Sequence, residues 1–433
     1  MNEFDIPQRL PMVTMDRCVD ALACTGEMII QAELHFQDSL DADRLCRALC
    51  LVLDAEPVLG CRFVSHAWAP WWERVEVEPE ELLTVTDDPE EFDGFYHRPL
   101  ALEKGPRIRA FLLSPPGTRL LVQLDHRAGD AGGTKDAVAC LGQIYTELGR
   151  DPSFRPQPNV TGTRGLDQLL REISLKRTPR LALESLRTHK KAFIPRRSHR
   201  FLLEKGDPSQ PALLLQHLDE KQVRSLAENA KKAGATLNDL FLAAFLRANV
   251  RVGRWNGTDQ LRYVSTVDLR NWYLSSGKAE GVCNLSCMEF LNLGTYMDNT
   301  IEETLSRVVA RTRPRKSKGI GLSGFLLAIP FFGVLPFSWL HSFFQWGARW
   351  GVSKGNMANT FTNMGPIRED QVFFDRPAEK AWLITPAGYP PLFVFGLTGY
   401  KGTLTLSART FSPGSQRQVL GDYLNAALEE LPW

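Results

Sequence analysis

Residues 118–133 read TRLLVQLDHRAGDAGG, and this stretch decides the fold. The centre of 118–126 is apolar on both faces of an extended chain, as is typical of a strand buried inside a sheet. The chain then turns at Gly129, and an apolar helical pattern runs from Thr134 to Gly149. In α/β proteins, functional residues gather where a buried strand ends beside the start of a helix.

His126 is the last residue of this predicted strand, and Asp130 and two glycines precede the predicted helix. The first N–H groups of a helix lack partners within it and can bind negative charge. An imidazole beside free amides supplies a general base and an oxyanion site. The alternative is a structural role, with His126 held by polar contacts and Asp130 acting as a helix cap. The stretch taken by itself leaves both interpretations open.

The composition describes a globular protein without a strong overall charge. The chain has 433 residues, which is enough for two domains, and 43% of them are hydrophobic, 23% are charged, and the net charge is +1. No pattern of an RNA-binding, zinc-finger or helix-turn-helix module occurs. We therefore predict no nucleic-acid partner.

The cysteines and histidines do not predict a metal site. No two of the eight cysteines have the C-x-x-C spacing, and the histidines show no metal-binding spacing either. The first residues contain acids and no apolar core of a signal peptide. Free thiols without an export signal predict a cytoplasmic protein.

Strands and helices alternate in both halves of the sequence, which predicts an α/β protein with two domains of similar kind. The Pro- and Gly-rich residues 151–165 separate them, so we place the domains at 1–165 and 166–433. The predicted strands cover residues 27–36, 107–114, 118–126, 212–218, 261–268, 358–364, 391–398 and 402–409.

Four stretches resemble the condensation-domain and chloramphenicol-acetyltransferase-like superfamily. Residues 125–131, DHRAGDA, are similar to its H-H-x-x-x-D-G motif. Residues 264–270, VSTVDLR, resemble a strand of its second domain that ends in Arg, and 360–367, TFTNMGPI, resemble a strand that crosses between domains. The closing 403–410, TLTLSART, resemble its last strand, so the resemblance covers almost the whole chain.

The resemblance implies a fold of two similar subdomains in a V, with the active site at their junction and a crossing strand near 358–367. His126 then matches the catalytic histidine, while Asp130 and Arg270 match a structural ion pair across the junction. The other matching positions are backbone groups of the motif loop (Ala131, Gly132 and Gly133) and tunnel candidates (Asp125, Thr362 and Asn363). Two of these depart from the motif, because Asp125 replaces its first histidine and Ala131 its glycine.

The implied activity is transfer of an acyl group to an amine or a hydroxyl, in natural-product or lipid biosynthesis. The donor is an acyl-phosphopantetheine thioester, on coenzyme A or a carrier protein, and no permanently bound cofactor or metal is expected. Basic residues at 171–200 and 304–368 suit an anionic donor, although they also fit a solvated basic face. A condensation-like docking module without catalysis is the alternative that the two departures favour.

Residues 319–348 form an aromatic run without Asp, Glu, Lys or Arg. Pro330 and Pro336 argue against one membrane-spanning helix. We predict broken helical pieces buried against the second domain, where they line an acyl tunnel. A peripheral membrane patch between basic flanks is the alternative, and it would indicate a lipid acyltransferase at the membrane surface.

Overall fold

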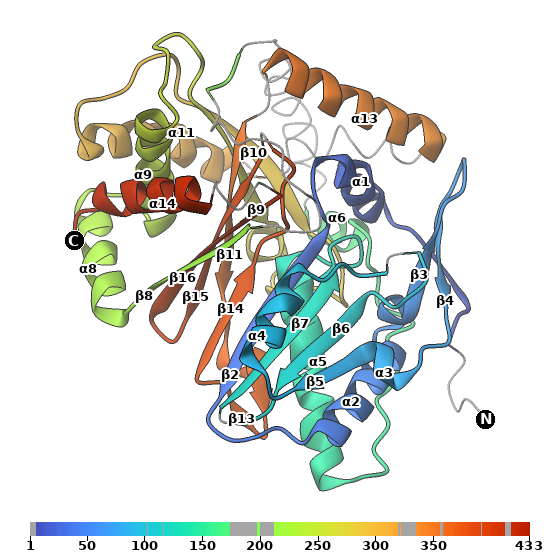
Figure 1. Cartoon of the computed structure of the whole chain (residues 1–433). Helices are drawn as coiled ribbons and strands as arrows, with labels where there is room; N and C mark the ends of the chain where they lie inside the picture. The colour runs from blue at the N-terminus through green and yellow to red at the C-terminus, as the bar shows by residue number, and fades with distance from the viewer. Residues whose placement is uncertain are drawn as a thin grey trace.

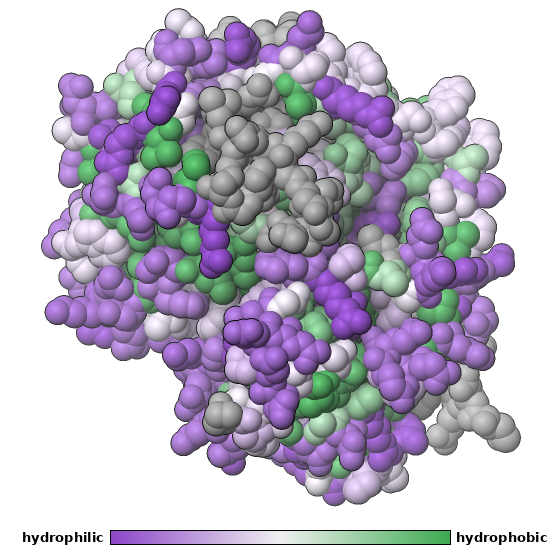
Figure 2. Space-filling model, in the orientation of Figure 1, coloured by the Kyte–Doolittle hydropathy of each residue, from purple (hydrophilic) through white to green (hydrophobic). Residues whose placement is uncertain are grey.

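The protein is built from two halves, each containing one large sheet (Figure 1). The structure is a computed structural model, and it describes residues 6–101, 103–115, 117–173, 197–199, 212–318, 321, 335–355, 358–390, 392–411 and 417–433. Most of the predicted basic stretch at 171–200 and the residues 322–334 of the aromatic run lie outside this part. Figure 2 shows one face that is largely hydrophilic, with hydrophobic residues visible in separate groups.

The first sheet has five strands in the order β14-β2-β7-β6-β5. Their bounds are Lys380–Ile384, Ile29–Phe36, Thr118–Asp125, Ile108–Leu113 and Leu83–Thr86. Helices α2 (Ala42–Ala55) and α5 (Ala131–Arg150) cover one face, and α4 (Pro89–Gly94) lies on the other. The central strand β7 pairs antiparallel with β2 and β6, so backbone hydrogen bonds hold it on both sides.

Alternating side chains explain why β6 and β7 lie at the centre. In β6, Ile108, Ala110 and Leu112 point to the core beneath α2 and α5, whereas Phe111 and Leu113 point to the core beneath α4. Both faces are apolar because both are covered. Strand β7, which leads into His126, is covered on both faces in the same way. The expected burial of this strand is therefore confirmed.

The second sheet has six strands in the order β10-β9-β11-β15-β16-β8. Their bounds are Ser286–Asn292, Arg262–Asp268, Asn359–Pro366, Val394–Tyr400, Thr403–Thr410 and Ala212–Leu218. Helices α8 (Glu220–Lys232), α9 (Leu237–Val252), α11 (Ile301–Lys318) and α14 (Arg417–Glu429) gather on one side of it in Figure 1. Their apolar residues share one core with the sheet, as an amphipathic helix on a sheet requires.

The chain crosses between the halves after β11. Strand β11 itself lies in the six-stranded sheet, paired with β9 and β15. The next residues, from Ile367 to Phe374, pack in the first core against α5, and β14 then completes the five-stranded sheet. The chain returns through β15. The five-stranded sheet therefore combines strands from both halves of the sequence, whereas all six strands of the second sheet come from residues 212–410.

The structure confirms the predicted fold class and most of the predicted elements. The strands predicted at 27–36, 107–114, 118–126, 212–218 and 261–268 are present within two residues of the expected bounds. Helix α5 begins at Ala131 rather than at Thr134, because Asp130 caps it: the Asp130 carboxylate accepts a hydrogen bond from the N–H of Gly133. The glycine pair therefore lies inside the first turn of the helix.

The prediction of broken, buried helical pieces is wrong for residues 337–348 of the aromatic run. They form α13 (Phe337–Lys354), a single helix that contacts α1 (Thr14–Leu22) of the first half. Only Phe337, Leu340 and Gly351 of this helix are buried, while Trp339 and Trp346 are largely exposed. Spacing alone could not show which apolar face would meet the core, because α13 has aromatic residues on both of its faces. Among the described helices, none combines the length and the apolar character that a membrane span requires.

Candidate active site

His126 follows the last residue of β7 and is held by the sheet. Its N–H donates to the carbonyl of Met28 at 2.8 Å, just before β2 begins. The Asp125 side chain points into the protein and is fully buried, whereas the His126 ring is half-buried. Opposite orientations are what neighbouring residues at the end of a strand adopt. The strand thus presents an imidazole at its end on a fixed backbone.

Asn284 sets the orientation of the His126 ring. His126 Nδ1 lies 3.2 Å from Asn284 Oδ1. The amide of Asn284 cannot turn around, because its Nδ2 donates to Asp16 Oδ1 at 3.2 Å and to the carbonyl of Arg127 at 3.0 Å. Asn284 therefore offers only an oxygen to the imidazole, an arrangement that favours the neutral tautomer with its proton on Nδ1 and its lone pair on Nε2.

A buried carboxylate supports Asn284 from behind. Asp16 is fully buried, and it accepts hydrogen bonds from Arg164 at 2.7 Å and from Trp72 at 3.0 Å. Burial raises the pKa of Asp16, while Arg164 acts in the opposite direction. His126, Asn284, Asp16 and Arg164 thus form a chain of polar contacts that reaches the interior.

Arg164 also holds the backbone of the loop. Its Nη2 donates to the carbonyl of Ala128 at 2.8 Å, and its Nε donates to the carbonyl of Val282 at 2.8 Å. Arg164 belongs to the segment 151–165 that the sequence predicts to be a linker. That segment therefore also fixes the loop that presents His126.

Asp130 joins the two halves through the expected ion pair. Arg270 Nη1 lies 2.9 Å from Asp130 Oδ1, and both side chains are buried. The same carboxylate accepts from the N–H of Leu285 and the hydroxyl of Ser286, each at 2.7 Å. Burial by itself would raise the pKa of Asp130, but Arg270 and these donors outweigh it and lower the pKa below its usual value of 3.8.

The glycines of the motif leave room for this contact. A Cβ atom at Gly132 would lie 2.5 Å from Arg270 Nη1, and one at Gly133 would lie 2.7 Å from the carbonyl oxygen of Cys283. The N–H of Gly133 is used by the Asp130 cap. Ala131 and Gly132 begin the helix, where N–H groups have no carbonyl within the helix to pair with. Their proposed contribution to an oxyanion site stays a prediction.

Asp125 is the residue that replaces the first histidine of the motif. Its carboxylate accepts from Arg107 at 2.8 Å and from Arg127 at 3.0–3.1 Å, and Arg127 also donates to Asp20 at 3.0 Å. Burial would raise the pKa of Asp125, but Arg127 and Arg107 lower it. Asp125 thus stabilises the loop from inside the protein and does not line the cavity described next.

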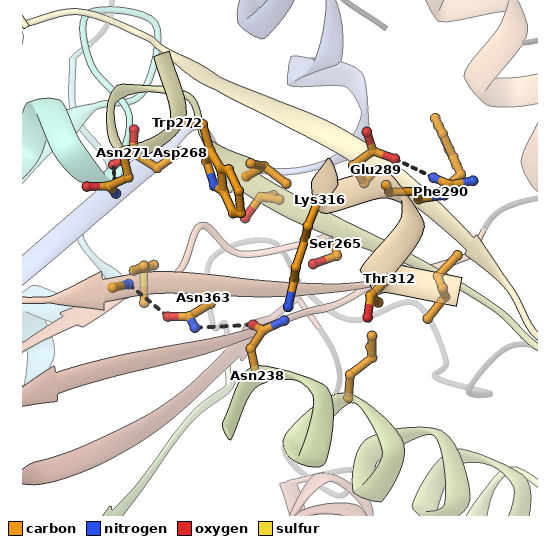
Figure 3. Close-up of a pocket in the computed structure, with 17 residues that line it drawn as sticks. Asn238, Ser265, Asp268, Asn271, Trp272, Glu289, Phe290, Thr312, Lys316 and Asn363 are labelled. Atoms are coloured by element: carbon orange, nitrogen blue, oxygen red, sulfur yellow. Dashed lines mark hydrogen bonds and ion pairs between the residues drawn. The ribbon is translucent and has the colours of Figure 1, made fainter. Parts of the chain in front are cut away.

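A cavity of about 260 Å³ lies in the second half, between β9, β10 and β11 and the helices α9 and α11 (Figure 3). Asn363 lines it and donates to Asn238 Oδ1 at 3.1 Å, while Thr362 contacts the lining residue Thr266 at 2.5 Å between hydroxyl oxygens. Lys316 extends into it toward Asn238 (Figure 3). The remaining lining residues are Leu242, Ser265, Val267, Asp268, Asn271, Trp272, Glu289, Phe290, Leu291, Thr312, Arg315, Met364 and Gly365.

The cavity borders the junction of the two halves. Asp268 lines it and accepts from Arg270 Nη1 at 3.2 Å, so one guanidinium contacts both the cavity wall and Asp130. On the other side, Lys135 of α5 donates to the carbonyl of Met364 at 3.0 Å. The structure therefore brings the predicted residues Asp130, Arg270 and Asn363 into one region.

Sequence reasoning missed Asn284, Asp16 and Arg164. These residues have no spacing that connects them to His126, and only the fold brings them together. A polar residue inside GVCNLSC, a stretch next to a strand, was the one visible sign of Asn284. In the described part of the chain, no group of His, Cys, Asp and Glu is arranged to hold a metal ion.

Comparison of the sequence finds no matching protein-family model and no matching curated protein. Comparison of the structure finds similar solved folds. The first condensation domain of the CDA synthetase superimposes with a TM-score of 0.65 and 18% identity, covering 96% of this chain and 94% of that one. The chain has the two-subdomain condensation-domain fold.

Two further solved structures share this fold over nearly their whole chains. The trichothecene 15-O-acetyltransferase of Fusarium sporotrichioides matches with a TM-score of 0.68 at 13% identity, covering 98% of this chain and 95% of that one. The polyketide synthase associated protein 5 of Mycobacterium tuberculosis matches with a TM-score of 0.62 at 16% identity, covering 96% and 97%. At these identities the agreement establishes the condensation-domain fold and not the reaction.

Replacing Asn284 with Ala should impair catalysis without removing the base. The substitution deletes the acceptor for Nδ1 of His126, so we expect acyl transfer to fall about 10–100-fold, which is less than loss of the base itself. The check is a double-mutant cycle with His126→Ala. Asn284→Ala should have no further effect on the rate in the His126→Ala background, and additive losses would contradict a role exerted through His126.

The Asp130–Arg270 pair should make stability depend on pH in the acid range. Because the pKa of Asp130 is lowered in the folded state, its contribution is complete above its unfolded value of about 3.9 and is lost as the pH falls below that value. The free energy of unfolding of Asp130→Asn should therefore rise less steeply between pH 2 and 5 than that of the parent chain.

Asp268→Asn is the matched control for this measurement. Burial raises the pKa of Asp268, which contacts the same arginine, so its removal should make the acid-range slope steeper rather than shallower. Slopes that change in the same direction for both variants would contradict the assignment.

Gly132→Ala should destabilise the protein because its methyl group would displace the Arg270 guanidinium. We expect a loss of about 1–3 kcal/mol in the free energy of unfolding. Gly347→Ala in α13 is the control, since no atom lies within 4 Å of its Cβ position, and helix propensity predicts a gain of about 0.5–1 kcal/mol. Chemical denaturation of the two variants measures both effects, and an equal response at both positions would refute the close-contact argument.

Proposed function

We propose that this protein transfers an acyl group from a phosphopantetheine thioester to an amine or a hydroxyl, with His126 as the general base. One observation carries the proposal: Asn284 Oδ1 lies 3.2 Å from His126 Nδ1, a contact that favours the tautomer with its lone pair on Nε2. The condensation-domain fold supports it, because an O-acetyltransferase adopts the same fold with a TM-score of 0.68. The carrier of the thioester, coenzyme A or a carrier protein, is part of the proposal.

The proposed reaction is a direct transfer in two steps. His126 Nε2 takes the proton of the attacking hydroxyl or amine. At the same time the oxygen or nitrogen of that acceptor bonds to the carbonyl carbon of the thioester, which gives a tetrahedral oxyanion. We assign the stabilisation of that charge to backbone N–H groups at the start of α5, from Ala131 and Gly132. The intermediate then breaks its C–S bond, and the thiolate takes the proton back from Nε2.

The cavity of Figure 3 is the proposed binding site for part of a substrate. Its side chains include the amides of Asn238 and Asn363 and the hydroxyls of Ser265 and Thr312, which suit the two amide groups of a pantetheine arm. Phe290 and Leu291 add an apolar wall. A position beside the Asp268–Arg270 contact places this site next to the junction of the halves.

The solved structures with a similar fold also suggest a biological context. Several are parts of nonribosomal peptide synthetases, and another is named as a protein associated with a polyketide synthase. A donor on an acyl or peptidyl carrier protein and a role in natural-product or lipid biosynthesis follow from these names as proposals for this chain.

Loss of His126 should abolish transfer and leave the fold intact. We expect His126→Ala to lower the rate about 10²–10⁴-fold, the usual contribution of a general base. The assay follows thiol release from acyl-coenzyme A and acyl-carrier-protein donors with a panel of amines and alcohols. His66→Ala is the control, because His66 lies exposed in the loop between β3 (Cys61–Val64) and β4 (Trp71–Arg74).

Near-normal turnover of His126→Ala would refute the assignment of the base. A parent chain that binds an acyl carrier protein without releasing thiol in any combination would instead be a docking module. Calorimetric titration of the carrier protein, run beside the turnover assay, separates these two outcomes.

A further inference from the structure

Helix α13 presents an aromatic face to solvent. Its exposed side chains Trp339, Phe343, Trp346 and Trp350 are spaced by three or four residues, so they share one side of the helix. Trp339 is 69% exposed, Phe343 59% and Trp346 60%. Figure 1 shows α13 along the outside of the molecule above α1.

The opposite side of α13 fixes this orientation. Phe337 and Leu340 are buried, and His341 Nε2 lies 3.7 Å from Asp20 Oδ2 of α1. The N–H groups of Phe337 and Ser338 donate to the carbonyls of Trp68 and Ala67, at 3.2 and 3.0 Å. The helix therefore cannot roll to bury its aromatic face without breaking these contacts.

The exposed rings form a continuous surface. Phe343 and Trp346 have ring centroids 6.2 Å apart, and Trp346 and Trp350 are stacked at the same distance. Trp68, 65% exposed, lies in the loop whose carbonyl groups accept hydrogen bonds from the first turn of α13. A patch of adjacent large aromatic side chains on a soluble domain marks a place where another apolar phase or partner binds.

The composition of the patch favours binding to a lipid surface. Tryptophan has an apolar body and a polar N–H, and it is enriched where a bilayer meets water. Residues 337–354 contain no Asp or Glu, and Arg349 and Lys354 are exposed on the same helix, so the helix attracts anionic headgroups. A self-complementary contact between two copies would bring these like charges into one interface.

We propose that the aromatic face of α13, together with Trp68, docks the protein on an anionic lipid bilayer, with the helix lying along the membrane surface. This proposal does not depend on the proposed reaction. It also relates the bilayer to the active-site loop, because Asp20, which lies beside His341, accepts from Arg127 at 3.0 Å, and Arg127 follows His126.

Vesicle flotation tests the proposal. The purified chain is mixed with vesicles of phosphatidylcholine containing about one-third phosphatidylglycerol, and in parallel with pure phosphatidylcholine. We expect binding to the anionic vesicles, a blue shift of tryptophan fluorescence, and weaker binding at high salt. Replacing Trp339, Phe343 and Trp346 together with Gln should weaken the partition about tenfold or more.

Two controls make the result specific. The double variant Tyr296→Gln and Trp433→Gln removes aromatic side chains of similar exposure from other elements and should bind like the parent chain. Arg349→Gln with Lys354→Gln should lose only the preference for anionic lipid. Circular dichroism and the melting temperature of the triple variant should match those of the parent, and its acyl transfer between soluble substrates should be unchanged.

Three results would overturn the proposal. The first is a parent chain that does not bind anionic vesicles, and the second is undiminished binding by the triple variant. The third is a parent chain that is dimeric in sedimentation and becomes monomeric in the triple variant, since a second copy would then cover the patch. Failure of acyl transfer in all variants, with vesicle binding intact, would count against the proposed reaction alone.

Discussion

The carboxylate of Asp130 is the point on which the site depends. It is buried, and it accepts hydrogen bonds from Gly133 in α5, from Arg270 after β9, and from Leu285 and Ser286 where β10 begins. A buried charge is tolerated only when it is paired and its lone pairs are used, and losing one partner of such a pair costs about 3–5 kcal/mol. One side chain thus fixes three segments that come from both halves of the protein.

This constraint explains which departure from the family motif is tolerated. Ala131 stands where the motif has glycine, and its side chain packs against the first core, where a methyl group has room. The glycine whose replacement is costly is the next one, because Gly132 faces the Arg270 guanidinium. In this chain the residue that must lack a Cβ atom is thus the one beside Arg270, and residue 131 is not that residue.

The other departure, Asp125, shows how a buried polar residue can serve the loop without facing substrate. Its two arginine partners are fully or almost fully buried, and Arg127 extends the network to Asp20. The burial of these arginines is possible because each meets a carboxylate. Buried ion pairs of Asp125 and Arg127 thus hold the loop that presents His126 on its inner side. Arg164 and Asn284 hold the same loop by donating hydrogen bonds to its carbonyl groups.

The sequence predicted well what depends on local pattern and poorly what depends on distant packing. The strand before His126, the helix after it and the Asp130–Arg270 pair follow from periodicity and from a motif, and the structure contains them. Asn284 and Arg164 contact residues that lie more than 30 positions away in the sequence, and no local spacing predicts such contacts. Strand β14 was missed because five residues of a sheet edge give too short a pattern.

The aromatic run shows most clearly that the sequence does not predict distant packing. The helix that it forms also lies near the loop that presents His126. Hydrophobicity predicts that such residues leave water, but not what covers them. Residues 337–354 bury Phe337, Leu340 and Gly351, contact α1, and leave Trp339, Phe343 and Trp346 exposed on the other side of the helix. Because α1 contributes both Asp16, which supports Asn284, and Asp20, which contacts His341 and Arg127, this short helix lies between α13 and the loop that presents His126. A contact made at α13 is therefore connected to the loop that presents His126 through α1, because His341 lies beside Asp20 and Asp20 accepts a hydrogen bond from Arg127.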